Sequence, residues 1–506
     1  MSLAARARMR PVLYPAAILV AFVLNFLVET GVSPYAAARP LVVAVAVGLA
    51  LPWLAGLAAA GRDPAGVLGV IVVLMALAPG NRALVVLGLV AFTLLAVQPL
   101  LKRRATPSAA ARSPWPIATR VLTIGSVILL VAVGIKAVQL GRVETYARDL
   151  VAEFPLSPHA AAASPTSAGL PNMFFILLDG YPRADKLLSE FDIDNSGFIT
   201  DLRARDFVVA DHSRSNQVKT ELTLDQMFNY RSAAEIAQGL DRANRLLRVD
   251  INDGAFFADL HRLGYETVAV SPAFEHVALR RADVFVDTGQ LNEFEWVMVG
   301  MTGLSVLFDA VLPDLAADAH RARILDAFEA AERQARSFVA GPEFIFVHVV
   351  APHAPQVFAA DGHPNDLSGF NLPYSDPAEI ARFGFEEYAR RLEGQLQFLN
   401  DRTIRLVDSV VAADPRAVVV VFSDHGSGAP SRESGETYPY ADLHTANLLA
   451  VRSPGKPGII DDRSTLANLL PRLLRKYTGT GPPEVPETIY VLADEPDASF
   501  VFVRPD

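Results

Sequence analysis

The sequence predicts an N-terminal α-helical membrane domain of about five transmembrane helices, followed by an α/β/α sandwich with a mostly parallel sheet. Two observations predict it. Long apolar stretches follow one another through the first 150 residues with only short polar breaks. From residue 171 onward, short apolar runs typical of buried strands alternate with helical patterns. Strands separated by helices pair in parallel and are covered on both faces of their sheet.

The membrane domain is predicted over residues 1–141. A bilayer core about 30 Å thick needs about 20 apolar residues per helix, and four of the five stretches suit that length. The third lies between Pro64 and Pro79 and is also compatible with a tilted or re-entrant segment. A buried soluble core would not place five such runs in succession. The stretches are 11–28, 40–60, 65–79, 83–101 and 117–140.

The basic residues predict how this domain is oriented, because cytoplasmic loops are the ones enriched in Lys and Arg. The segments before the first stretch, after the second and after the fourth carry Arg6, Arg8, Arg10, Arg62, Lys102, Arg103, Arg104 and Arg112. The opposite segments carry only Arg39 and Arg82. We therefore expect a cytoplasmic N-terminus in a multi-pass protein of the cytoplasmic membrane, with everything after residue 142 on the extracytoplasmic, periplasmic side. If the third stretch did not cross, that side would be reversed, but the basic loop 102–112 argues against it.

The rest of the chain is acidic. Residues 1–150 contain 14 of the 45 Lys and Arg residues and 4 of the 55 Asp and Glu residues, which leaves 31 basic and 51 acidic side chains and a formal net charge of −20. This portion lacks the basic surface that nucleic acids require. The chain has no cysteine, which excludes disulfides, thiolate metal ligands and a cysteine nucleophile.

A Pro- and Ala-rich linker is predicted over 142–170 and a folded domain over 171–506. No GxGxxG or GxxxxGK[ST] phosphate loop occurs, so a nucleotide-cofactor enzyme is disfavoured. The predicted strands are 172–178, 206–210, 266–271, 283–287, 343–350, 417–422, 446–452 and 499–503. The predicted helices are 186–204, 221–237, 254–263, 317–339, 378–412 and 463–477.

Two of these strands deliver acidic side chains at their carboxyl ends. The run 172–178 is followed by Asp179, and the run 417–422 is followed, after one serine, by Asp424 and His425. Ligands of open α/β sheets bind outside the carboxyl ends of the strands, and carboxylate and imidazole groups bind divalent cations. The three side chains are therefore candidate metal ligands. The competing interpretations are a strand-end aspartate that caps the next turn and a surface histidine.

A third apolar strand, 343–350, leads into a proline-rich loop and brings two histidines. His353 lies in the loop and is predicted to act in catalysis, by contacting an anionic substrate or metal or by protonating a leaving group. His348 lies within the strand and is predicted to contact substrate. A satisfied core histidine is the competing interpretation of His348.

Thr220 is the candidate nucleophile. It would lie at or just before the N-terminus of the helix that follows the strand 206–210, where free amides and the helix dipole stabilise an alkoxide. A hydroxyl coordinated to a divalent cation is activated by a lowered pKa, so no histidine base is required. A threonine that merely caps the helix is the competing interpretation. The weaker nucleophile candidates are Ser213, Ser215 and Thr223.

Three further side chains are candidates for substrate binding. Arg214 and Lys219 flank the proposed nucleophile and would neutralise phosphate charge as it builds in the transition state, unless they are solvated loop charges. His444 precedes the predicted strand 446–452 and is a candidate late ligand, substrate contact or loop residue.

These elements, in this order, resemble the alkaline phosphatase superfamily. Its sulfatase-like branch is most similar, with membrane-anchored lipoteichoic acid synthases and phosphoethanolamine transferases among its members. The resemblance covers about residues 171–480 and rests on segments 176–180, 215–220, 348–355, 462–471 and, most specifically, Ser423-Asp-His-Gly426. It implies an alkaline-phosphatase-like fold in which Asp179, Thr220, Asp424 and His425 surround one divalent metal ion (Mn, Zn, Mg or Ca). It also implies that Thr220 carries a covalent phospho-intermediate.

The chain departs from this branch in two ways. True sulfatases carry a Cys or Ser within a Cys/Ser-x-Pro/Ala-x-Arg sequence that is converted to formylglycine, and Ser213-Arg-Ser-Asn-Gln217 does not match the serine form. Two-zinc phosphatases need a further Asp/His set, for which His353, His363 and His444 are available, but no spacing requires it.

We therefore expect a membrane-anchored, metal-dependent phospho-group transferase or hydrolase acting on an envelope lipid or glycan. A sulfatase or a phosphomonoesterase is the enzymatic alternative. The alternative of another class is a catalytically inactive domain that binds an envelope glycan or a partner protein.

Overall fold

A computed structural model of the 506-residue chain describes residues 13–30, 34–58, 115–152, 169–236, 251–289, 291–337, 341–430, 441–492 and 500–503. The chain divides by compactness into two units. The first contains the residues up to Thr145 together with two later insertions, Leu291–Leu315 and Gly369–Asn371, and the second contains the remainder. The boundaries predicted from composition at 141 and 170 stay predictions.

Among its described residues up to Thr145, the first unit contains the apolar helices α2 (Tyr14–Thr30) and α3 (Ala38–Ala58) and most of α6 (Trp115–Ala152). The windows Pro34–Leu51 and Thr119–Gln139 are long and apolar enough to cross a membrane, and α2 is a shorter apolar helix. These helices fit a membrane domain. The third and fourth predicted stretches fall within 59–114, outside the described residues, so the number of five crossings stays a prediction.

Helices α2 and α6 run in the same direction. Near their N-terminal ends, Tyr14 packs with Ile18 and Leu122. Toward their C-terminal ends, Lys136 Nζ of α6 lies 2.6 Å from Glu29 Oε1 and 3.2 Å from Asn25 Oδ1 of α2. Antiparallel helices would instead pair the beginning of one with the end of the other. The chain therefore leaves α6 at the same end of the helix pair at which it leaves α2.

The second unit is built on a seven-stranded mixed sheet of order β2-β7-β6-β1-β5-β3-β4. Only β7 runs against its neighbours β2 and β6, and the other pairs are parallel. The strands are β1 (Met173–Leu178), β2 (Val208–Val209), β3 (Glu266–Val270), β4 (Val284–Val286), β5 (Glu343–Val349), β6 (Val418–Phe422) and β7 (Leu449–Arg452). The last predicted strand, β9 (Phe500–Val503), pairs with β8 (Ile489–Leu492) in a separate small sheet.

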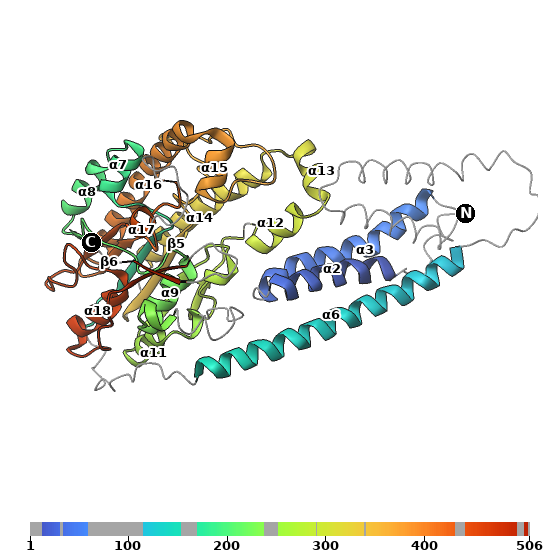
Figure 1. Cartoon of the computed structure of the whole chain (residues 1–506), viewed down its shortest axis with the longest axis horizontal. Coiled ribbons are helices and arrows are strands. Elements are labelled where there is room, and N and C mark those ends of the chain that lie inside the picture. The colour runs from blue at the N-terminus through green and yellow to red at the C-terminus, as the bar shows by residue number, and fades with distance from the viewer. Residues whose placement is uncertain are drawn as a thin grey trace, which may run out of the picture. The chain divides into compact units, whose positions relative to one another are not determined.

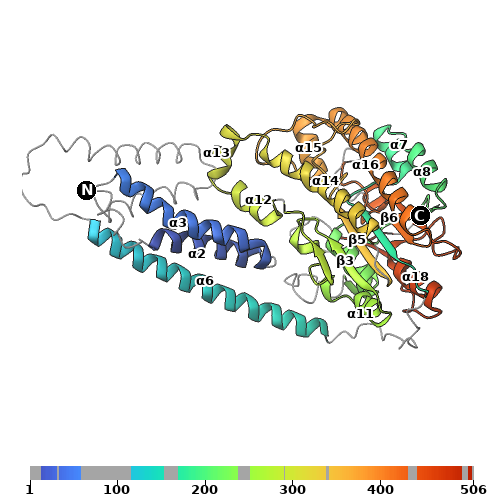
Figure 2. The same ribbon diagram turned by 180° about the vertical axis from the view of Figure 1, so that it is seen from behind.

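Helices cover both faces of the large sheet, so β1 at its centre is fully buried and entirely apolar. One face packs Phe175 and Leu177 against α9 (Thr220–Asn229), α11 (Ala255–Arg262) and α18 (Leu469–Thr478). Figures 1 and 2 show α14 (Leu315–Arg336) and α16 (Phe385–Ala413) over the opposite face. The three layers agree with the predicted sandwich.

Two predicted helices are broken by residues with positive φ, which end a helix. The helix expected over 186–204 is divided into α7 (Ala184–Phe191) and α8 (Ser196–Arg203), since Asp192 has a φ of 61°. The helix expected over 378–412 is divided at Gly384, with a φ of 83°, into α15 (Asp376–Phe383) and α16.

The insertion 291–315 forms two helices that were not among the predicted elements, α12 (Glu293–Gly300) and α13 (Leu304–Val311). Asn292 begins α12 with a capping box, because its side chain accepts from the Glu295 amide while the Glu295 carboxylate accepts from the Asn292 amide.

Candidate metal centre and nucleophile

The site lies where three neighbouring parallel strands end. β1 pairs with β5 on one side and with β6 on the other, and Leu177 is in register with both His348 and Phe422. The residues that follow these strands therefore emerge at one edge of the sheet. This order brings Asp179 together with the loop after β6, although about 245 positions separate them.

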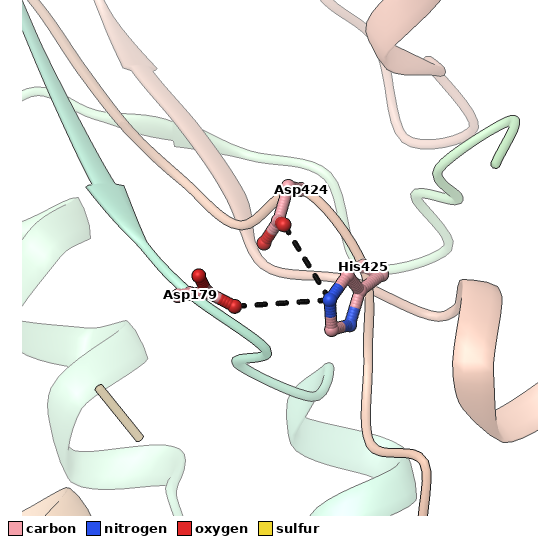
Figure 3. Close-up of side chains that lie close together, drawn as sticks. All are labelled: Asp179, Asp424 and His425. Atoms are coloured by element: carbon pink, nitrogen blue, oxygen red, sulfur yellow. Dashed lines mark ion pairs between the residues drawn. The ribbon is translucent and has the colours of Figure 1, made fainter. Parts of the chain in front are cut away.

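Asp179, Asp424 and His425 are buried and lie together (Figure 3). Each offers one ligand atom within 4.8 Å of the others. His425 Nε2 lies 3.7 Å from Asp179 Oδ1 and 3.4 Å from Asp424 Oδ2. Neither carboxylate oxygen has a hydrogen-bond partner among the described residues. Because an unsatisfied buried carboxylate oxygen is costly, the cluster fits a divalent cation that would bind both oxygens.

The ring of His425 is held in the tautomer that a metal ligand needs. Its Nδ1 lies 2.7 Å from the carbonyl oxygen of Gly426 and must donate to it, so Nε2 of the neutral ring carries a lone pair toward the two carboxylates. Burial opposes protonation of His425, but the carboxylates of Asp424 and Asp179 outweigh it and raise the pKa. A proton and a cation therefore compete for Nε2.

Asp179 is held ionised by histidines. Burial alone would raise the pKa of Asp179, but the hydrogen bond from His348 and the charges of His353, His348 and His425 together lower it below its ordinary value. The contact with His348 joins its Nε2 to Asp179 Oδ2 at 2.9 Å. His348 is therefore a buried side chain that contacts a candidate metal ligand. Its predicted contact with substrate stays a prediction.

Because Gly426 has no side chain, the neighbouring backbone can approach it more closely than it could approach any other residue. A Cβ at this position would meet the carbonyl oxygens of Leu443 and, at 2.6 Å, of Ala446. The Gly426 amide also donates to His444 O at 2.8 Å. Glycine at 426 therefore lets α17 (Ala441–Thr445) pack directly against the loop that carries His425.

His353 and His444, both predicted from the sequence, lie beside this cluster. The His425 ring centroid is 6.4 Å from that of His353 and 5.3 Å from that of His444. The His353 amide donates to Asp179 O at 2.9 Å. Nδ1 of the His353 ring donates to Ala354 O at 2.8 Å, so Nε2 is the ring nitrogen that is available to a substrate.

The electrostatic surroundings of His444 differ from those of His425. Burial, with the charges of His425, His353 and Lys219, lowers the pKa of His444 to about 3, so this ring is neutral near pH 7. His363, the remaining histidine considered for a second metal, is exposed and contacts Asp361 instead.

The first turn of α9 packs against the loop of candidate ligands. Thr223 Oγ1 donates to the Asp424 carbonyl oxygen at 3.1 Å, and Thr220 is the first residue of α9. Lys219 occupies the cap position, so Thr220 is not the cap. No residue within the described part of the chain is hydrogen-bonded to the Thr220 hydroxyl, whereas Ser215 Oγ is bonded to Gln217 O at 2.7 Å.

The two basic residues near Thr220 have different surroundings. Arg214 donates to Thr445 Oγ1 at 3.0 Å and forms an ion pair with Asp442, both in α17. Arg214 therefore fastens the helix that carries His444. Lys219 is partly buried and close enough to influence His444.

Asp376 helps to position the loop after His425, although the sequence did not point to it. Its Oδ2 accepts from Ser427 Oγ at 2.7 Å and from the Gly428 amide at 2.8 Å. These bonds hold the loop after His425 against α15. No motif surrounds Asp376, and its partner loop is about 50 residues away, so only the folded structure identifies it.

Comparison with known proteins places the chain among related sequences. Residues 171–477, more than half of the chain, match the family model described as Sulfatase. A search of curated proteins finds no significant match.

Several solved structures are similar. Lipooligosaccharide phosphoethanolamine transferase A (EptA), an integral membrane protein from Neisseria meningitidis, is 14% identical with a TM-score of 0.41, over 94% of this chain and 96% of that chain. The C-terminal periplasmic domain of EcEptC from Escherichia coli is 15% identical with a TM-score of 0.43, over 69% and 96%. The phosphonate monoester hydrolase of Agrobacterium radiobacter is 14% identical with a TM-score of 0.39, over 64% and 80%.

Proposed function

Because the chain belongs to the sulfatase family of the alkaline phosphatase superfamily, we propose that it is a membrane-anchored, metal-dependent phospho-group transferase or hydrolase. It acts outside the cytoplasm on an envelope lipid or glycan. One observation carries the proposal: the buried ligand atoms of Asp179, Asp424 and His425 lie within 4.8 Å of one another, against the first turn of the helix that begins at Thr220.

Asp179, Asp424, His425 and the Thr220 hydroxyl would hold one divalent cation. When bound there, the cation would stabilise the alkoxide of Thr220 and the negative charge of a phosphate ester. A mixed oxygen and nitrogen donor set is compatible with Mn, Zn or Mg.

The remaining groups supply nucleophile and proton. Deprotonated Thr220 attacks phosphorus, the Oγ–P bond forms, and the bond from phosphorus to the leaving oxygen breaks. In this step the His353 ring starts with a proton on both nitrogens: Nδ1 keeps its hydrogen bond to Ala354 O, and Nε2 gives its proton to the leaving oxygen. In the second step an acceptor hydroxyl gives its proton to the same nitrogen, attacks the phosphothreonine and frees Thr220. Water as acceptor gives a hydrolase, and a sugar or lipid hydroxyl gives a transferase.

Phosphate chemistry is favoured over sulfate chemistry by the nucleophile. The chain has no cysteine, and the serines at 213 and 215 are not followed by the sequence that formylglycine formation requires. Threonine cannot form that aldehyde but can carry a phosphoryl group.

The direction of the helices supports the extracytoplasmic location. Helices α2 and α6 run in the same direction, so if both span the membrane the chain leaves α6 on the side on which it leaves α2. With a cytoplasmic N-terminus, the catalytic domain would emerge on the opposite side of the membrane.

The test is the intact mass of the full chain after incubation with a divalent metal and an envelope lipid extract. We expect a discrete added mass on the wild type and on Thr220→Ser, and none on Thr220→Ala. An adduct on Thr220→Ala would contradict the assigned nucleophile. A folded chain with neither bound metal nor adduct would favour the binding-domain alternative, and bound metal with phosphate release but no adduct would identify a hydrolase.

A further inference from the structure

The insertion 291–315 leaves the second unit and returns to it, yet it packs with the membrane helices. It belongs to the first unit by compactness. Helices α12 and α13 have eight residues each and meet at 90°. At 1.5 Å per residue each is about 12 Å long, whereas a bilayer core is about 30 Å thick. The insertion is therefore an excursion that starts and ends on one side of the membrane.

Three contacts fix where this excursion lies. The rings of Phe294 and Phe26 are 5.0 Å apart, and Asn292 Nδ2 donates to Ala36 O at 3.2 Å. Arg39 Nη2 lies 2.7 Å from Glu295 Oε2. The partners Phe26, Ala36 and Arg39 all lie where α2 ends and α3 begins. Helix α12 therefore packs against the C-terminal end of α2 and the N-terminal end of α3.

The second short insertion, 369–371, packs against both α12 and α13. Phe370 packs its ring 5.5 Å from both Trp296 and Phe308, and its amide donates to Asp309 Oδ1 at 2.6 Å. Other apolar side chains of the insertion remain exposed. Val297, Met301, Val311 and Leu312 expose 40%, 60%, 64% and 50% of their surface.

Exposed apolar side chains also occur elsewhere in this unit. Clustered exposed apolar side chains mark an interaction site, and α3 and α6 expose similar side chains, such as Val42 and Ile128, along their candidate spans. Helices α12 and α13 belong to the same compact unit as α3 and most of α6. Short apolar helices beside membrane spans lie in the boundary between headgroups and acyl chains.

We propose that residues 291–315 form an interfacial hairpin that inserts Val297, Met301, Val311 and Leu312 into the outer leaflet of the lipid bilayer. Its partner is lipid, at the depth of the headgroups and the first part of the acyl chains. The hairpin ties the middle of the catalytic chain to the membrane independently of α6. The inference rests on the membrane placement given under the proposed function, but not on the activity itself.

Single cysteines test this directly, because the chain contains none of its own. Met301→Cys and Val311→Cys in the full chain are labelled with an environment-sensitive fluorophore and reconstituted in phosphatidylcholine vesicles. The vesicles carry a nitroxide either near the headgroup or near the end of the acyl chain. Leu188→Cys, an exposed apolar position of α7, is the water-facing control, and Ile128→Cys of α6 is the deep control.

We expect the labels at 301 and 311 to lose fluorescence with the shallow nitroxide, the label at 128 with the deep one, and the label at 188 only with aqueous iodide. Labels at 301 and 311 that behave like the one at 188 would overturn the proposal. So would protection from every quencher, which would indicate cover by protein, or deep quenching, which would indicate re-entry. Depth is read without turnover, so an inactive enzyme with shallow labels would contradict the proposed function and leave the hairpin supported.

Discussion

At Asp179 and Asp424, one carboxylate oxygen accepts a hydrogen bond and the other has no partner among the described residues. His348 and the Gly180 amide supply those bonds, so each carboxylate is oriented with its second oxygen toward His425. This division of labour is typical of metal sites, in which outer partners fix the ligands.

Asp424→Asn is expected to lower metal affinity while the sheet remains folded. The amide removes the charge and replaces one of the two possible ligand oxygens with a donor. Metal per chain, measured after dialysis against defined free metal, should require on the order of 10- to 100-fold more metal for half-saturation. Asp408→Asn, an exposed position paired with Arg205, is the matched control and should bind metal normally.

His348→Gln separates the two roles considered for this residue. Because His348 donates to Asp179, its loss should weaken metal binding and leave the KM at saturating metal nearly unchanged. Gln can still reach with a donor, so it should lose less than His348→Ala. A raised KM at unchanged metal affinity would instead support the predicted contact with substrate.

The sequence located the candidate ligands because each follows a recognisable buried strand. It did not reveal the contact between His348 and Asp179, which depends on β5 lying next to β1. Strand order is decided by packing between distant segments, and neither strand carries a local signal for its neighbour.

At the scale of elements, α15 carries a buried acid beside the His353 loop. Both oxygens of Glu379 accept from the Gln356 amide at 3.3 Å. Burial, with the nearby Asp376 carboxylate, raises the pKa of Glu379 to about 8 from an ordinary value of 4.5. Between these values the folded chain binds a proton that the unfolded chain has lost.

The free energy of unfolding should therefore fall as pH rises from about 4.5 to about 8, by up to a few kcal/mol. Glu379→Gln should remove most of this dependence. Thermal midpoints of the two proteins, measured below and above this window, give the comparison, and Glu386→Gln on the exposed side of α16 controls for the change in net charge. Equal slopes for wild type and Glu379→Gln would show that Glu379 does not titrate in the window.

Apolar strands with clear ends were predicted well, and helices were predicted less well where tertiary structure interrupts them. Asp192 adopts a left-handed conformation that its sequence does not require, and this residue divides a predicted helix. The apolar segment 293–311 was not identified as helical. Its partners Phe26 and Arg39 lie more than 250 positions earlier, and Gly300 and Gly303 interrupt its periodicity.

At the scale of the whole molecule, the parallel direction of α2 and α6 predicts sidedness. Tyr35→Cys, between α2 and α3, and Leu188→Cys, in the catalytic domain, should both react with a membrane-impermeant maleimide from the same side of sealed vesicles. Both positions are exposed. Labelling from opposite sides would require an even number of crossings and would contradict the location proposed for the catalytic domain.

The central position of β1 has a consequence for how the protein matures. β1 is the first strand of its sheet to be synthesised, yet its two neighbours, β5 and β6, follow about 170 and 245 residues later. Closing such long loops is slow, so Asp179 waits for nearly the whole domain before Asp424 and His425 join it. An ion held by these three residues would therefore be acquired by a finished sheet and not by the growing chain. If the domain folds outside the cytoplasm, the metal supply of that compartment would decide which ion the protein carries.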